Sequence, residues 1–409
     1  MSLAFASTEL GADEFRRRRE EARRNGSPAW LWPEVPAESW AAAMAGISQA
    51  ASAVLAGGRG ELPPLELEAL SLACYTSGMG PLLEAWLETA ALEAPEDSRS
   101  LLALHLAHGR ERAKKVETQS REVVAALVDC GVPVVVLKGG HTAYSYFPEP
   151  AARPAADLDL LVERDSSAQA EVALARTGLE CAARSKRESS WVRQGTALEP
   201  RSIWLAHAGD PWSVDLHSSL DFSASPGAPL VRFDAAEPIE TSGPWPLDDG
   251  AGVLGQPLLL LHLAVHASGG LHSLTLLRIV EIVLVIRQDI ARERLSWDEF
   301  LHVGALTNAL GAAYPALSMA ERLAPGTIPS HVLEISAELA PRRARAIVDR
   351  LEPATVHRVD RASIAEHFMW VAGFSGWARQ LASDLAPGSD FWPIYEARAY
   401  RLLRGRVSR

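Results

Sequence analysis

Residues 132–140 read VPVVVLKGG, and residues 157–162 read DLDLLV. The first stretch is a run of β-branched residues that follows Gly131, a pattern typical of a short buried strand. The second stretch is equally apolar apart from two acidic residues. We therefore predict two buried strands, the first ending in a lysine and two glycines and the second starting with paired carboxylates.

The two acids of the second strand are Asp157 and Asp159. Side chains alternate between the faces of a strand, so these carboxylates project together, roughly 6–7 Å apart. Unpaired charge on an apolar strand is costly, and a divalent cation is a natural partner. Ligands that are all oxygen favour Mg²⁺ or Mn²⁺ over zinc. The alternative is a strand end held by ordinary salt bridges.

A third acid, Asp215, lies within another apolar run that reads VDLH. We predict strands over 203–207 and 213–220, joined as a hairpin through Gly209–Pro211, so that Asp215 lies beside the other acids. Three carboxylates on adjacent strands can hold two metal ions about 3.5–4 Å apart. His217 shares the face of Asp215 and is either a ligand for nucleotide or acceptor, or a satisfied core histidine.

The turn after the first strand contains Lys138, Gly139 and Gly140 and leads into an expected helix. Two glycines allow backbone amides to approach phosphate oxygens, and a helix N-terminus adds partial positive charge. Lys138 and Arg153 are candidates to neutralise phosphate. Most turns of this kind, however, are only turns.

The rest of the chain reads as helical on both sides of this region. Apolar residues recur at helical spacing over 37–130 and from residue 257 onward, and a further helix is expected over 166–177. A short strand is expected at 191–193. These elements predict an α+β fold with a small mixed-sheet core between helical domains. The predicted divisions are an N-terminal helical region 1–120, an α/β core 121–222, a Pro- and Gly-rich loop or linker 223–250, and a C-terminal helical domain 251–409.

Composition excludes some function classes. The net charge of the 409 residues is −11, which disfavours binding along a nucleic acid, because phosphate contacts need a basic surface. Three cysteines without a CxxC spacing indicate small buried hydrophobes in a reducing compartment. The N-terminus has no pattern of a signal peptide, so we expect a cytoplasmic protein.

The most apolar region, 253–287, includes charged and imidazole side chains and therefore predicts buried helices, not a membrane span. His262 and His266 have the spacing of zinc ligands but lack the glutamate of the zinc-protease motif. We expect a packed or pocket-lining pair, with His266 a candidate to face the cleft. For Arg278 and Glu281, three positions apart, we expect an ion pair within the helix.

Four of these elements occur together: Leu137-Lys138-Gly139, Tyr146-Phe147-Pro148, Arg153-Pro154 and the DLDLLV strand. In this order they resemble a bacterial nucleotidyltransferase family of the DNA polymerase β-like nucleotidyltransferase superfamily. The resemblance covers mainly 120–220, and the helices over 258–287 are also similar. One departure is that the superfamily usually has Gly-Ser at the phosphate turn where this chain has Gly139-Gly140.

The resemblance implies roles for individual residues. Gly139 and Gly140 would cradle a triphosphate, Asp157 and Asp159 would hold two Mg²⁺ or Mn²⁺ ions, and Asp215 would complete the site and help deprotonate an acceptor hydroxyl. The implied reaction moves a nucleoside monophosphate from an NTP, such as ATP, to a small molecule, a peptide or a protein, with release of pyrophosphate. The alternatives are an antitoxin-like or nucleotide-binding protein with a degraded site, and a kinase-like phosphoryl transferase.

Overall fold

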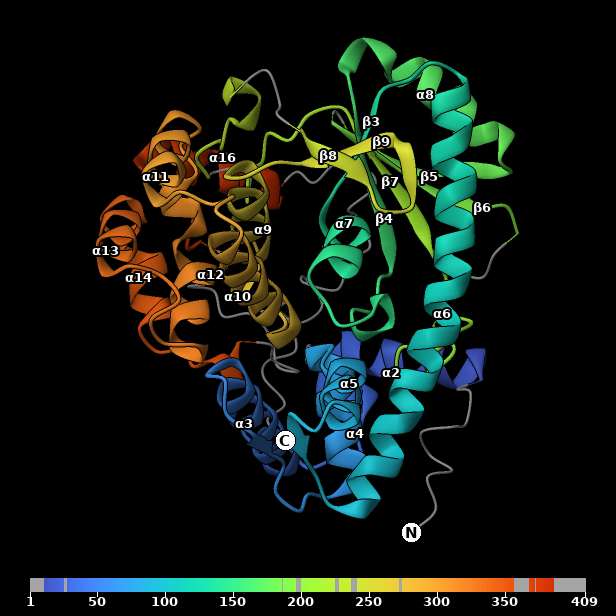
Figure 1. Cartoon of the computed structure of the whole chain (residues 1–409), viewed down its shortest axis with the longest axis vertical. Coiled ribbons are helices and arrows are strands. Elements are labelled where there is room, and N and C mark those ends of the chain that lie inside the picture. Colours follow the sequence, from blue (N-terminus) through green and yellow to red (C-terminus); the bar gives the residue numbers. More distant parts are fainter. Residues whose placement is uncertain are drawn as a thin grey trace.

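A mixed sheet lies between groups of helices in the computed structural model (Figure 1). The structure describes residues 11–25, 28–185, 187–195, 200–224, 228–236, 241–271, 274–356, 368–371 and 373–385. The strands of the sheet are β3 (Val134–Val136), β4 (Asp157–Val162), β5 (Leu179–Arg184), β6 (Glu188–Arg193), β7 (Ser213–His217), β8 (Thr241–Trp245) and β9 (Asp248–Leu254). Their spatial order is β5-β6-β7-β4-β3-β9-β8, which confirms the α+β class with a mixed-sheet core.

Helices from the N-terminal and C-terminal parts of the chain flank this sheet (Figure 1). The N-terminal group contains α2 (Ala12–Asn25), α3 (Ala37–Leu55), α4 (Leu67–Ser77), α5 (Gly80–Glu88) and α6 (Glu96–Asp129), with the two-residue parallel strands β1 (Gly60–Glu61) and β2 (Leu92–Glu93). Along the chain, α7 (Lys138–Ser145) lies between β3 and β4, and α8 (Ser167–Arg176) lies between β4 and β5. The C-terminal group contains α9 (Leu258–Ser268), α10 (Leu276–Ala291), α11 (Trp297–Leu306), α12 (Leu310–Leu323), α13 (Ser330–Leu339), α14 (Arg342–Val348) and α16 (Gly373–Leu385).

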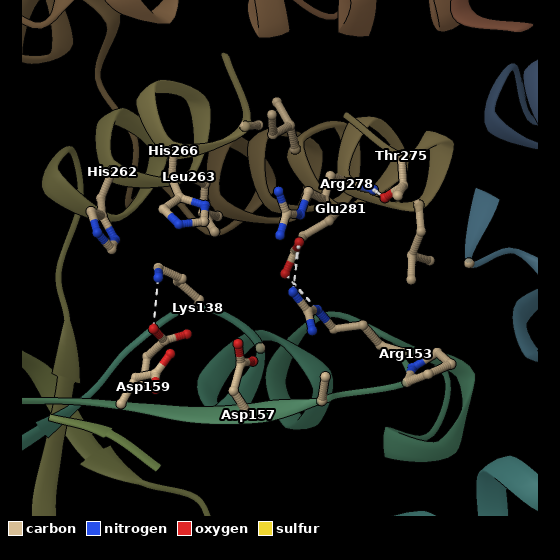
Figure 2. Close-up of a pocket in the computed structure, with 18 of the residues that line it drawn as sticks. Lys138, Arg153, Asp157, Asp159, His262, Leu263, His266, Thr275, Arg278 and Glu281 are labelled. Carbon is tan, nitrogen blue, oxygen red and sulfur yellow. Dashed lines mark hydrogen bonds and ion pairs between the residues drawn. The ribbon is translucent and has the colours of Figure 1, made fainter. Parts of the chain in front are cut away.

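The two faces of the sheet have different environments. Leu158, Leu160 and Val162 of β4 share an apolar cluster with residues of α6 and α8, so this face is packed. The intervening positions, Asp157 and Asp159, lie on the opposite face, toward α9 and α10 (Figure 2). The alternation of side chains along β4 therefore places both acids on the face that is not sealed by α6 and α8.

The helical predictions over 37–130 and from residue 257 are confirmed wherever the structure describes the chain; residues 357–367 and 386–409 lie outside it. The predicted division at 120/121 stays a prediction, but α6 spans it without a break. In the described part of the chain, no helix has both the length and the apolar character that crossing a membrane requires.

The predicted strand over 203–207 and its hairpin are wrong. This segment is irregular and buried, and side chains satisfy its backbone: Trp32 donates to the carbonyl of Ile203 at 2.8 Å, and Ser71 donates to that of Trp204 at 3.0 Å. β7 instead pairs antiparallel with β6 and parallel with β4. Apolar character alone did not distinguish a buried loop with satisfied carbonyls from a strand.

The predicted loop over 223–250 is wrong for its last part, where β8 and β9 form a hairpin and β9 adds to the sheet parallel to β3. The glycines that indicated a loop have a packing reason here. A Cβ at Gly250 would lie 2.9 Å from both methyl groups of Val128 on α6, so the strand requires glycine where the helix crosses it. Strand β5 was also not expected.

A buried arginine of α6 ties together the starts of two strands. Arg112 donates from Nε to the carbonyl of Ala155 at 2.8 Å, from Nη1 to that of Asp210 at 2.8 Å, and from Nη2 to that of Pro211 at 2.9 Å. Ala155 precedes β4, and the other two residues precede β7. One guanidinium therefore holds the entrances of the two strands that contain the acids.

We predict that Arg112→Met lowers the free energy of unfolding by about 3 kcal/mol, because it leaves buried carbonyls without a charged donor. Arg110→Met is the matched control on the same helix: Arg110 is exposed and pairs with Glu88 and Glu149, so its loss should cost under about 1 kcal/mol. Urea denaturation measures both. Equal losses in the two variants would contradict the assigned role of Arg112.

Candidate active site

A cavity of about 750 Å³ lies between the open face of β4 and β7 and the helices α9 and α10. Figure 2 shows Asp157 and Asp159 on β4 below, and His262, His266 and Arg278 on the helices above. Seven of the eight residues that we selected from the sequence line this cavity: Lys138, Gly139, Arg153, Asp157, Asp159, Asp215 and His217. The structure therefore brings these residues to one place, while their chemical roles stay predictions.

The register of β4 and β7 places the third acid. The two strands run parallel, and Asp215 is the direct neighbour of Asp159 across the pair. Asp157 lies two residues earlier in β4 and projects from the same face. All three carboxylates therefore face the cavity from adjacent positions of one sheet.

Asp159 is the most strongly held of the three acids. It is buried, and its Oδ1 accepts from Lys138 Nζ at 2.6 Å and from His217 Nε2 at 2.9 Å. Burial alone would raise the pKa of Asp159, but Lys138 and His217 together outweigh burial and lower this pKa well below its usual range. Asp159 is therefore ionised, and Nε2 of His217 is already used in the hydrogen bond to this carboxylate.

The other two acids are less firmly held. Asp157 has no side-chain hydrogen bond or ion pair in the described part of the chain, and burial together with the charge of Asp159 raises its pKa. Asp215 accepts a hydrogen bond from Ser190 at 2.7 Å. Burial raises the pKa of Asp215 too, and the charges of Asp157 and Asp159 add to this effect against the hydrogen bond from Ser190.

The sequence predicts that these acids bind a divalent cation. Among the described residues, no group of three or more His, Cys, Asp or Glu side chains is arranged to hold a metal ion. The three acids nevertheless fit Mg²⁺ or Mn²⁺ chemically, because they offer only carboxylate oxygens and Asp157 has no side-chain partner among the described residues. In the structure Asp159 Oδ1 accepts from both Lys138 and His217, so a cation that ligates this oxygen would compete with Lys138 for it.

The two glycines of the turn have different environments. A Cβ at Gly139 would lie 2.1 Å from Nη1 of Arg153, so this glycine lets the arginine lie against the start of α7. A Cβ at Gly140 would lie 2.8 Å from methyl groups of Leu158 and Val136. Gly140 packs on the sheet and is not among the described residues that line the cavity, so its role in triphosphate binding stays a prediction.

Arg153 forms a buried ion pair with Glu281 across the cavity (Figure 2). Its Nε and Nη2 donate to the two carboxylate oxygens at 2.8 and 3.1 Å, and Thr142 of α7 also donates to Glu281. The predicted ion pair between Arg278 and Glu281 is therefore wrong. This bond instead joins the segment before β4 to α10, and Arg153 has less freedom to bind phosphate than expected.

His262 and His266 line the cavity, which agrees with the second of the two expectations for them, a packed pair or a pocket-lining pair. Burial lowers the pKa of His262 to about 3 and that of His266 well below its usual value, so both imidazoles are neutral near pH 7. Their rings lie 6.2 Å apart, and no partner for Nδ1 of His262 exists among the described residues.

Several lining residues were not identified from the sequence. Cys74, Tyr75 and His105 come from α4 and α6 of the N-terminal group, and Phe222 and Arg187 come from segments beside β7 and β6. None of them belongs to a motif in the sequence. Only the packing of the N-terminal helices against the sheet brings them to the cavity.

We predict that Glu281→Ala lowers the free energy of unfolding by about 3 kcal/mol, because it leaves the guanidinium of Arg153 buried without its partner. Glu122→Ala removes an exposed carboxylate that pairs with Arg193 at 3.3 Å, and should cost under about 1 kcal/mol. Thermal and urea unfolding compare the two variants. A Glu281 variant as stable as wild type would rule out a structural role for the ion pair.

A comparison with protein-family models matches residues 64–325 to the family described as uncharacterised nucleotidyltransferase. No curated protein and no solved structure shows significant similarity to the chain. The match begins before α4 and ends after α12, so it includes both walls of the cavity. Membership of the DNA polymerase β-like superfamily stays a prediction. Since the family model covers more than half of the sequence, the chain belongs to the uncharacterised nucleotidyltransferase family and is a transferase of the nucleotidyltransferase kind.

Proposed function

We propose that this enzyme transfers a nucleoside monophosphate from an NTP to a hydroxyl, or a similar nucleophile, of a small molecule, peptide or protein. The observation that carries the proposal is the placement of Asp157, Asp159 and Asp215 side by side on one wall of a large cavity. Its volume of about 750 Å³ lies within the usual range for ligand sites. The family membership supports an NTP as the donor.

The three carboxylates would hold Mg²⁺ or Mn²⁺. Bound there, the cations would neutralise phosphate charge and make the acceptor hydroxyl more acidic. Lys138 donates to Asp159 in the structure and lies at the cavity wall, so its ammonium group is within reach of an incoming phosphate as well as of the carboxylate.

Asp215 is the best candidate for the general base. Burial and the two neighbouring acids raise its pKa, so it holds a proton more readily than an ordinary aspartate. In the proposed step the acceptor oxygen forms a bond to the α-phosphorus as the bond from that phosphorus to the β-phosphate oxygen breaks. The hydroxyl proton passes to Asp215, and pyrophosphate leaves.

We predict that Asp157→Asn and Asp159→Asn each reduce pyrophosphate release by at least about 100-fold, because each removes a carboxylate that would hold the cation on which the proposed nucleotidyl transfer depends. Asp249→Asn is the control, since Asp249 is exposed on β9 and does not line the cavity. The assay incubates each NTP with Mg²⁺ and candidate acceptors and quantifies pyrophosphate and labelled product.

The products separate the alternatives. Release of nucleoside diphosphate instead of pyrophosphate would indicate a kinase-like phosphoryl transfer. Wild-type protein that binds neither NTP nor Mg²⁺ in calorimetry would favour an interaction protein with a degraded site. Full activity in both Asn variants would remove the acids from the catalytic machinery.

A further inference from the structure

Arg278 differs from the other Lys and Arg side chains of the cavity wall in its hydrogen-bond and ion-pair partners. Lys138 donates to Asp159 at 2.6 Å, Arg153 is paired with Glu281, and Arg187 donates to the carbonyl of Asp221 at 2.8 Å. Within the segments that the structure describes, the guanidinium of Arg278 has no hydrogen-bond or ion-pair partner. A charged donor that faces an open cavity without a partner is available to a ligand.

The position of this guanidinium is set by its helix. Ile279, Val280 and Ile282 are buried in the main core and fix α10, while the side chain of Thr275 accepts from the backbone N–H of Arg278 at the start of the helix. Figure 2 shows Arg278 on α10 above the strand that carries Asp157. Its positive charge also lowers the pKa of Asp157, although burial and Asp159 raise that pKa overall. The guanidinium of Arg278 therefore influences the carboxylate of Asp157, at the start of β4, electrostatically.

The charges of the lining show why an unpaired arginine matters. The lining carboxylates outnumber the Lys and Arg side chains: Asp157, Asp159, Glu188, Asp215, Asp221 and Glu281 against Lys138, Arg153, Arg187 and Arg278. A triphosphate adds several more negative charges. Lys138 and Arg153 pair with carboxylates and Arg187 donates to a backbone carbonyl, so among these described side chains Arg278 has no partner to release before it binds a polyanion.

We propose that Arg278 binds the β- and γ-phosphates of the NTP, the part that leaves as pyrophosphate, and thereby selects triphosphates over monophosphates. This inference rests on the proposed function. The α-phosphate must lie near Asp215, which takes the acceptor proton, and the polyphosphate then extends along β4 past Asp157 toward α10. A guanidinium suits this task because its planar array of donors matches phosphate oxygens in pairs.

The test is calorimetric binding of non-hydrolysable α,β-methylene triphosphates of the four common nucleosides, and of the matching monophosphates, in the presence of Mg²⁺. Arg278→Met should weaken triphosphate binding by about 10- to 100-fold and change monophosphate binding by less than about 2-fold, as expected for the loss of charge-assisted hydrogen bonds. Arg292→Met is the control, because Arg292 is exposed just beyond the end of α10 and does not line the cavity.

The outcomes separate this inference from the proposed function. If the wild type binds no triphosphate analogue, the proposed function itself fails. If the wild type binds and Arg278→Met binds equally well, or loses both ligands equally, the role of Arg278 is wrong while the proposed function stands. Arg278→Gln, which keeps a polar side chain, repeats the comparison if the Met variant melts early.

Discussion

The parallel pairing of β4 with β7 is the constraint on which the site depends. It places Asp215 directly beside Asp159 and brings three carboxylates onto one face of an otherwise apolar sheet. Such an arrangement is costly unless the charges find partners. Lys138, His217 and Ser190 each donate to one of these acids, and Arg112 holds the entrances of both strands from behind. The donors around the acids thus offset much of the cost of placing three carboxylates close together.

The cavity joins two parts of the chain that are far apart in sequence. The sheet supplies the acids, and the helices α9 and α10 supply neutral imidazoles and a guanidinium that has no partner in the described part of the chain. The ion pair between Arg153 and Glu281 crosses between these walls and fixes their separation, assisted by Thr142. In the proposed reaction the guanidinium of the opposite wall would add to the positive charge of the cations, because the acids alone would repel a triphosphate.

Local pattern was enough to find the acidic wall. The alternation of apolar and acidic residues over 157–162 predicts a strand with two carboxylates on one face, and the glycine turn predicts a helix start next to it. Long-range features were beyond such patterns. The strand order, the antiparallel β6 between β5 and β7, and the pairing of Arg153 with a glutamate 128 positions away follow from tertiary packing.

Two errors show the same limit from the other direction. The segment 203–207 has a strand-like composition, but its Ile203 and Trp204 carbonyls accept from the side chains of Trp32 and Ser71. The end of 223–250 has a loop-like composition but forms strands under α6. Gly140 shows the same effect of neighbours, since a Cβ at this position would lie 2.8 Å from side-chain atoms of Leu158 and Val136. The type of a residue limits the backbone conformations it can adopt, and the contacts with its neighbours determine which of these it adopts.

The most direct test of the central claim is anomalous X-ray diffraction from crystals soaked with Mn²⁺ and a non-hydrolysable NTP. The account predicts manganese peaks within bonding distance of Asp157, Asp159 and Asp215, with Lys138 moved from Asp159 toward phosphate. Crystals that contain the nucleotide elsewhere, or that show no manganese at the acids while Lys138 stays on Asp159, would contradict it.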